Sequence, residues 1–350
     1  MMRKSLFALL AVFFAMSAQA QDSLRLLPPG FKISGSADVY YKYNFNESTD
    51  GKTSFTNTHN SFELNMISLK LESSFKNVGM VADIGFGKRA EDFSYNDEKT
   101  RLAIKQLYIS YAPASWLKFT MGSYSTHVGY ELVDAYANRN YSMSYMFSYG
   151  PFFHTGVKAD LTFGSHSFMV GVFNPTDFKS ATWGGIKFIG AQYGFAPASV
   201  PLKFYLNYIG GRDTFQTRND QLDAVITYQV APKFGIGYNG TYSMYKNGVS
   251  SNWYGSALYL NYDPVESFGL TLRGEIFGDK DNIKVYTDKT EYPEGGNVFA
   301  LTLSAQYKIG GFTLIPEVRF DSGSKDVFFD KDNVPKSSSA NVLLAAIYKF

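Results

Sequence analysis

Residues 340–350 read Ala-Asn-Val-Leu-Leu-Ala-Ala-Ile-Tyr-Lys-Phe, and this stretch is the clearest indication of the fold. Side chains of an extended strand alternate between two faces, so one face of this stretch is entirely apolar or aromatic. The members of that face are Val342, Leu344, Ala346, Tyr348 and Phe350, whereas the other face carries Asn341 and Lys349. An unpaired apolar edge invites aggregation, so this strand needs a partner. We expect it to pair with the first strand of the mature chain, which closes the sheet into a barrel.

The amino terminus has the features of a secretory signal peptide. A basic start at Arg3 and Lys4 precedes an apolar run, residues 5–16, that is too short to span a bilayer. Ala18-Gln19-Ala20 is a small-residue cleavage site. Residues 1–20 are therefore the predicted signal peptide.

Composition narrows the classes of protein that remain. Removal of Arg3 and Lys4 lowers Lys+Arg from 33 to 31, which equals the 31 Asp+Glu, so the mature chain has no formal net charge. This balance gives no reason to expect a nucleic-acid partner. The chain has no cysteine, which excludes disulfides, thiol chemistry and cysteine metal sites. Beyond the signal peptide, no apolar run approaches the roughly 18 residues of a transmembrane helix.

Long alternating strands favour a membrane barrel over a soluble sandwich. From Phe31 to Phe45 apolar and polar side chains alternate almost without interruption. Strands in soluble sheets average about 5 to 6 residues, whereas tilted membrane strands need about 9 to 11. We therefore predict a short periplasmic segment at residues 21–30 and a transmembrane β-barrel over residues 31–350. A soluble all-β protein is the alternative, because sandwich strands also show polar faces to water.

The second predicted strand, residues 61–75, changes phase. The apolar residues first occupy even positions, at Phe62, Leu64 and Met66, and then odd positions, beginning with Ile67. A β-bulge at Met66-Ile67 would produce this shift.

Short and long connections alternate along the chain. The predicted long connections are residues 46–60, 88–100, 125–150, 175–183, 210–220, 279–296 and 322–339, with a medium one at 246–252. Between them lie short turns of about two to six residues. Short periplasmic turns and long extracellular loops are typical of outer-membrane barrels. Eight connections on the long side predict an all-β, antiparallel barrel of sixteen strands.

The polar strand faces would line the interior of this barrel. The candidate pore-lining residues are Asp38, Lys42, Lys118, Lys158, Asp160, Lys203, Asp223, Arg273, Glu275, Glu317 and Arg319. These charges would be costly if dry and unpaired, so we expect a wet interior, and barrels of about 16 to 18 strands leave an aqueous channel. Both signs alternate along the wall, so we predict no strong preference for anions or cations. Alternatively, most of these charges form wall pairs that only stabilise the barrel.

The connection at residues 125–150 is unusually apolar for a loop. It holds many tyrosines, and it also contains four polar candidates for a pore constriction: His127, Glu131, Asp134 and Arg139. Its aromatic side chains need a surface on which to pack. We expect the loop either to fold into the barrel and narrow the pore, or to pack on neighbouring loops or a second subunit.

Several stretches resemble the putative β-barrel porin-2 family of OmpL-like outer-membrane proteins. They are Gly129-Tyr130-Glu131, Asn138-Arg139-Asn140-Tyr141-Ser142, the run of residues 147–157, Leu272-Arg273-Gly274-Glu275-Ile276-Phe277-Gly278-Asp279 and Pro316-Glu317-Val318-Arg319-Phe320-Asp321. This resemblance implies a pore for small hydrophilic solutes in the outer membrane of a Gram-negative bacterium. The terminal Phe350 resembles the signal that the outer-membrane barrel assembly machinery reads.

Enzyme chemistry has little support. The four histidines are scattered, and none pairs with a carboxylate at metal-ligand spacing. Ser165-His166-Ser167 lies at a predicted turn, where a polar turn explains it better than a hydrolase triad. We therefore expect a passive porin without cofactor or metal, surrounded by lipid and open to association between copies. The alternatives are a closed barrel with a structural or adhesive role and, with less support, an outer-membrane hydrolase.

Overall fold

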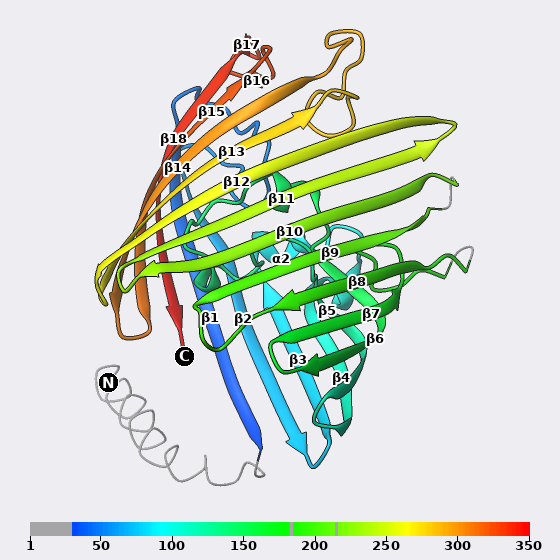
Figure 1. The fold of residues 1–350 in the computed structure, drawn as a ribbon. Coiled ribbons are helices and arrows are strands. Elements are labelled where there is room, and N and C mark those ends of the chain that lie inside the picture. Colours follow the sequence, from blue (N-terminus) through cyan, green and yellow to red (C-terminus); the bar gives the residue numbers. More distant parts are fainter. Residues whose placement is uncertain (1–29, 183–184, 214–215) are drawn as a thin grey trace, which may run out of the picture.

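The computed structural model describes residues 30–182, 185–213 and 216–350, which form a closed antiparallel barrel (Figure 1). The barrel strands are β1 (Phe31–Asn44), β2 (Ser61–Phe75), β3 (Val78–Phe86), β4 (Ile104–Ala114), β5 (Leu117–Ser125), β6 (Phe153–Phe163), β7 (His166–Phe173), β8 (Phe188–Phe195), β9 (Leu202–Arg212), β10 (Arg218–Ala231), β11 (Phe234–Asn247), β12 (Val249–Val265), β13 (Phe268–Asp279), β14 (Gly296–Ile309), β15 (Phe312–Gly323) and β18 (Ser338–Lys349). The predicted barrel of sixteen strands is confirmed. The predicted signal peptide lies outside the described residues.

The last strand closes the barrel against the first. β18 pairs antiparallel with β1 from Ser36 opposite Lys349 to Asn44 opposite Asn341. Gly35 and Phe350 exchange two backbone hydrogen bonds of 3.0 and 3.1 Å at the end of this seam. Each remaining pair of sequence neighbours in the ring is also hydrogen-bonded, so the sheet has no free edge.

The two faces of the wall differ as the alternation predicts. Apolar side chains point outward around the whole circumference, for example Leu64, Ile109, Val170, Ile189, Leu206, Leu222, Leu258, Ile276, Leu303, Val318 and Leu344. The inner face of β18 is more apolar than Asn341 and Lys349 alone indicate. Leu343, Ala345 and Ile347 are buried there and pack against Tyr141 from a connection inside the barrel.

Two features differ from the sequence predictions in detail. The bulge in β2 lies at Asn65, one residue earlier than predicted, because Asp38 pairs with Met66 and Val39 with Leu64. Met66 consequently faces inward and is buried. The predicted medium connection at 246–252 is a single-residue turn, since Gly248 adopts φ 76° and lets β11 continue directly into β12.

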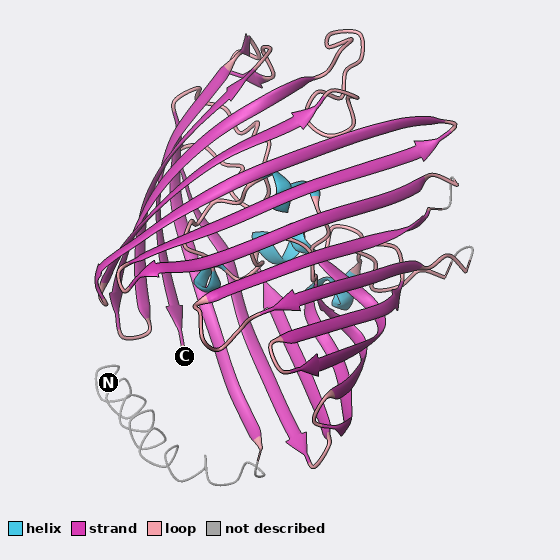
Figure 2. Ribbon diagram, viewed as in Figure 1, coloured by secondary structure: helices cyan, strands magenta, loops and turns pink. Residues whose placement is uncertain are grey.

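Short helices lie inside the ring of strands, where Figure 2 shows them in cyan. They are α2 (Lys88–Phe93), α3 (Tyr145–Tyr149) and the 3₁₀ turns η2 (Lys99–Ala103) and η3 (Ala135–Ala137). A two-stranded sheet of β16 (Phe328–Phe329) and β17 (Pro335–Lys336) occupies the last long connection. Within the described ranges, no helix has both the length and the apolar character needed to cross a membrane.

Candidate functional site

Residues 126–152, the inner loop, leave the end of β5 and cross the interior of the barrel. Along its course the loop bonds to strands from all sides of the wall. These contacts are His127 with Tyr208 of β9, Gly129 with Asp223 of β10, Tyr130 with Asn239 of β11, Glu131 with Arg273 of β13, and Tyr141 with Glu317 of β15 and Asp38 of β1. The inner loop therefore lies within the barrel and spans its width.

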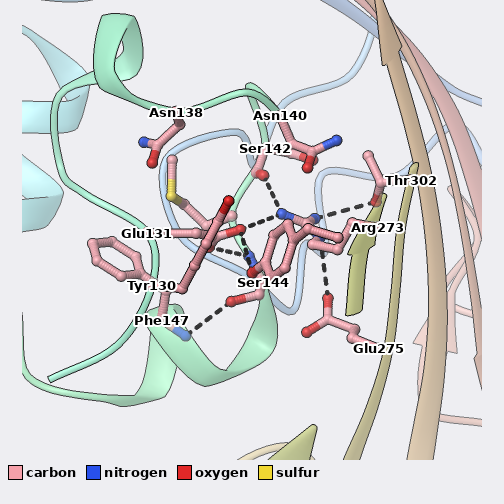
Figure 3. Close-up of polar contacts among 12 residues, drawn as sticks. Tyr130, Glu131, Asn138, Asn140, Ser142, Ser144, Phe147, Arg273, Glu275 and Thr302 are labelled. Carbon is pink, nitrogen blue, oxygen red and sulfur yellow. Dashed lines mark hydrogen bonds and ion pairs between the residues drawn. The ribbon is translucent and has the colours of Figure 1, made fainter. Parts of the chain in front are cut away.

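Glu131 and Arg273 form the central ion pair of this arrangement (Figure 3). One guanidinium nitrogen of Arg273 donates to the Glu131 carboxylate at 2.5 Å and to the Ser142 carbonyl oxygen at 2.7 Å. The same carboxylate accepts from the Tyr259 hydroxyl at 3.1 Å and from the Ser144 backbone N–H at 2.8 Å. Both charged side chains are almost completely buried. Charge-assisted bonds of this kind hold the loop to the wall more strongly than neutral ones.

Wall residues also hold the backbone of the segment from Tyr141 to Tyr145. Glu317 accepts from the N–H groups of Tyr141 at 2.7 Å and Ser142 at 3.1 Å. Glu275 accepts from the N–H of Tyr145 at 2.9 Å. In return Arg319 donates to the Met143 carbonyl oxygen at 2.7 Å, while its other nitrogens bind Asp321. Carboxylates thus bind loop N–H groups, and guanidinium groups bind loop carbonyls.

The β2 bulge supplies one further anchor. Asn65 donates from its side-chain nitrogen to Asp38 at 2.8 Å and to the Tyr141 hydroxyl at 2.7 Å. The Tyr141 hydroxyl in turn donates to Asp38 at 2.6 Å. Because of the bulge, Asn65 and Met66 both face inward, so the extra residue adds the Asn65 amide to the interior beside Met66.

Two other polar candidates, Asp134 and Arg139, also anchor the loop to the wall. Asp134 lies 2.5 Å from Lys105, which also pairs with Asp83 of β3. Arg139 makes a two-pronged ion pair with Asp263 at 2.7 and 3.1 Å and donates to Thr271 at 2.7 Å. Arg139 therefore ties the loop to the ends of β12 and β13.

Other connections cover the inner loop on the long-loop side. Arg89 of α2 donates to the Val133 carbonyl oxygen at 3.0 Å and stacks over the rings of Phe55 and Tyr141. Phe55 in turn contacts the rings of Phe147 and Phe152. These phenylalanine rings belong to one buried cluster that also includes Val133 and Met143 of the inner loop.

Two cavities of similar volume lie beside the inner loop. The outer cavity has a volume of about 500 Å³ and lies among long connections, with Asn219 and Gln221 of β10 in its wall. The inner cavity has a volume of about 570 Å³ and is lined by Tyr130, Lys203 and the Thr227 end of β10. Between them along β10 lies Asp223, which accepts from the Gly129 N–H at 3.0 Å. The inner loop therefore separates the two cavities at Gly129 and Tyr130.

The structure divides the predicted pore-lining residues into two groups. Seven are buried against the inner loop or other wall residues: Asp38, Lys42, Asp223, Arg273, Glu275, Glu317 and Arg319. Lys118, Lys158, Asp160 and Lys203 keep exposed or half-buried side chains, and Asp160 pairs with Lys158 at 3.1 Å. The pore-lining role of all eleven stays a prediction. Asn65, Arg89 and Tyr259 were not identified from the sequence. Strand alternation could have placed Tyr259 on the inner face.

Burial also controls the protonation of two groups in the connections. Burial lowers the pKa of His127 to about 4, although its hydrogen bond to the Tyr208 carbonyl acts in the other direction. Burial raises the pKa of Asp177 to about 6, and the N–H groups of Phe152 and Phe153 limit that rise. His127 fixes the first end of the inner loop to β9, and Asp177 binds the N–H groups at the other end. No cluster suited to a metal ion occurs among the residues that the structure describes.

A sixteen-stranded antiparallel barrel with an apolar exterior, a polar interior and an internal loop defines the class of outer-membrane porins. Residues 30–350 match the family model described as putative beta-barrel porin-2, OmpL-like, and the chain belongs to this family. It is accordingly a porin of the Gram-negative outer membrane.

Solved structures show the same fold at low sequence identity. The outer-membrane channel DcaP of Acinetobacter baumannii is 13% identical with a TM-score of 0.62, over 91% of this chain and 97% of that one. An anion-selective porin from Comamonas acidovorans is 10% identical with a TM-score of 0.63, over 91% and 99%. The trimer form of OmpT from Vibrio cholerae is 10% identical with a TM-score of 0.62, over 91% and 99%. No curated protein sequence matches this chain.

Proposed function

We propose that the protein is a passive diffusion channel for small hydrophilic solutes, which cross the part of the interior that the inner loop leaves open. The main observation in support is the pair of cavities, with volumes of about 500 and 570 Å³, that lie on either side of the loop at Gly129 and Tyr130. Solutes would move down their gradient without a cofactor, and selectivity would come from pore width and from the charges of wall and loop.

Tyr130 is the residue to change in order to test this path. Its ring stacks on Tyr259 at a centroid distance of 4.1 Å, and it lines the inner cavity. Deleting the whole loop would remove the Glu131 partner of Arg273 and the two N–H donors of Glu317, so a point substitution is cleaner. Tyr136→Ala serves as the matched control, because Tyr136 belongs to the same loop but not to either of these two cavities.

The measurement is single-channel conductance of the purified protein in a planar bilayer. We expect stable steps from the wild type, a conductance roughly 1.5-fold larger for Tyr130→Ala because the constriction widens, and no change for Tyr136→Ala. Equal conductance in all three proteins would place the constriction elsewhere. The absence of steps from folded protein would overturn the diffusion channel.

A closed barrel with a structural or adhesive role is the second candidate. The observation in its favour is the burial of seven wall charges beneath or beside the inner loop, which leaves less of the wall in contact with water. The same conductance measurement separates the two candidates, because a closed barrel gives no steps.

The hydrolase alternative has less support from the contacts of the histidines. The ring of His166 bonds to the Tyr193 hydroxyl at 2.9 Å, and that of His154 bonds to the Thr126 hydroxyl at 3.0 Å. Neither contact joins a histidine to both a serine and a carboxylate. We therefore propose a channel without enzyme activity, and hydrolysis of ester or peptide substrates by the purified barrel would contradict this.

Association between copies through the lipid-facing surface is a further part of the proposal. Phe62 and Leu64 at one end of β2 are 85% and 80% exposed, more than most outward side chains. One solved relative in fold has a trimer form. Chemical crosslinking in membranes would show a ladder ending at a defined oligomer, and a monomer band alone would contradict association.

A further inference from the structure

The outer cavity combines aromatic faces with amide side chains. Tyr149 and Tyr245 contribute aromatic rings to its wall, and Asn57, Asn219 and Gln221 contribute amides. Ligand cavities typically offer aromatic contact area together with a few polar groups that fix orientation. This lining suits a small molecule that has both a ring or carbon chain and several hydroxyl groups.

Three lysines line the same cavity, and two of them already have carboxylate partners. Lys52 lies 2.8 Å from Asp50, and Lys88 pairs with Asp92. Lys284 makes no ion pair with any residue that the structure describes. Its ammonium group instead lies 5.4 Å from the ring centroid of Tyr245 and 5.9 Å from that of Tyr149. Lys284 is thus a cation held by two aromatic faces with no described carboxylate at ion-pair distance, although Asp177 of the same cavity acts on it electrostatically.

The backbone around Lys284 is fixed in advance. The carboxylate of Asp279, at the end of β13, accepts from four consecutive N–H groups at 2.7 to 3.0 Å. These donors are Ile283, Lys284, Val285 and Tyr286. A cation on a pre-organised backbone loses less entropy when it binds a ligand.

The acidic groups of the cavity are already occupied. Asp177 accepts from the N–H groups of Phe152 at 2.7 Å and Phe153 at 3.1 Å, and from the Tyr95 hydroxyl at 3.0 Å. Asp92 is paired with Lys88. Among the described groups of this cavity, the Lys284 ammonium is therefore the charged donor that no carboxylate directly engages, and it can donate to a solute.

We propose that the outer cavity binds a small organic anion that carries hydroxyl groups, such as a sugar phosphate, with Lys284 as the residue that recognises its charge. This inference rests on the proposed channel function and names a solute class for it. In the sequence, the balanced charges of the strands predicted no strong charge preference. Lys284 was not among those charges, because it lies in a connection between strands.

The test is blockade of single-channel current by glucose 6-phosphate, with glucose and inorganic phosphate as comparison probes. We expect glucose 6-phosphate to halve the current at a concentration about tenfold lower than either comparison probe, because a charge-assisted bond contributes about 1.5 kcal/mol or more. Lys284→Met should remove the advantage over glucose, and Lys284→Arg should largely retain it. Lys289→Met is the matched control, since Lys289 is exposed on the same connection and does not line the cavity.

Three results would overturn the inference. They are equal blockade by glucose and glucose 6-phosphate, equal blockade by inorganic phosphate and glucose 6-phosphate, and unchanged blockade in Lys284→Met. These results require open channels, so they are distinct from a failure of the channel function itself, which would give no conductance steps from folded protein.

Discussion

At the scale of single residues, buried charges organise the interior by binding the inner loop. Glu131 and Arg273 form an ion pair with almost no exposure to water. Backbone groups of the loop add hydrogen bonds, from the Ser144 N–H to Glu131 and from Arg273 to the Ser142 carbonyl oxygen. A buried charge is costly unless it is paired and hydrogen-bonded. The loop is therefore part of the stable structure of the barrel.

Replacement of Glu131 by glutamine tests this dependence. The amide keeps an acceptor for Tyr259 but leaves the buried guanidinium of Arg273 facing a neutral group. We expect the free energy of unfolding to fall by about 3 kcal/mol, measured by denaturant titration of the refolded protein. The control, Glu91→Gln on the exposed surface of α2, should change it by less than about 0.5 kcal/mol. Equal effects of the two substitutions would refute a special role for the buried pair.

The buried ring of His127 predicts that acid loosens the inner loop. Its pKa falls from 6.5 to about 4 on burial, near Lys158, Asp160 and Asp223. Between pH 6.5 and pH 4, His127 takes up a proton when the loop has left the interior but not when the loop is packed there. The contribution of the buried neutral ring to the stability of the packed loop is therefore complete above pH 6.5 and is lost as the pH falls toward 4. The full loss is about 3 kcal/mol.

Hydrogen exchange of residues 126–150 at pH 7 and pH 5 measures this effect. We expect protection in the wild type to decrease at pH 5 relative to His127→Gln, whose side chain does not titrate. The raised pKa of Asp177 acts in the opposite direction, but it is present in both proteins and cancels in the comparison. Parallel behaviour of the two proteins would count against His127 as the acid-sensitive group.

At the scale of elements, the extra residue in β2 couples the wall to the inner loop. Asn65 is buried inside the barrel, while Leu64 beside it stays on the lipid-facing side. A one-residue change of register moves a whole strand segment to the other face. The bulge thus allows both halves of β2 to keep their apolar side chains in lipid.

Deletion of Asn65 tests the bulge. Without it, Leu64 directly precedes Met66, so regular alternation keeps Phe62, Leu64 and Ile67 in lipid and Met66 in the interior. We expect the deletion variant to fold and to give the heat-modifiable band in gel electrophoresis. Deletion and Asn65→Ala should each lower the free energy of unfolding by about 1 to 3 kcal/mol, because both remove the amide bonds to Asp38 and Tyr141. Failure of the deletion variant to fold would show that the wall itself requires the bulge.

At the scale of the whole molecule, one seam decides whether the sheet is closed. The backbone of Phe350 pairs with Gly35, and its exposed ring points outward. A barrel without free edges satisfies its backbone hydrogen bonds in a medium that offers none. The aromatic ring of Phe350 has no role comparable to that of its backbone in closing the barrel, because the ring is exposed.

Phe350→Ser separates assembly in the cell from stability. We expect the amount of protein in the outer membrane to fall several-fold, because the assembly machinery would read the terminal residue. The same variant refolded in detergent should unfold within about 0.5 kcal/mol of the wild type, since the change is on the surface. Unchanged membrane levels would exclude Phe350 as the assembly signal.

The barrel, its sixteen strands and the orientation of the two faces could all be predicted from the sequence. These features depend on side-chain alternation and on connection length, both of which are local properties that one chain displays directly. The apolar composition of residues 125–150 also indicated that this loop needs a surface on which to pack. The change of phase in residues 61–75 indicated the bulge within one position of Asn65.

Which charges meet could not be predicted from the sequence. Glu131 lies 142 residues from Arg273 in sequence, and Tyr141 lies 103 from Asp38. Alternation places a side chain on the inner face but does not indicate what lies opposite, because that depends on the path of the inner loop across the barrel. For the same reason the balanced charges of the wall did not reveal Lys284, whose partners are two tyrosine rings from other parts of the chain.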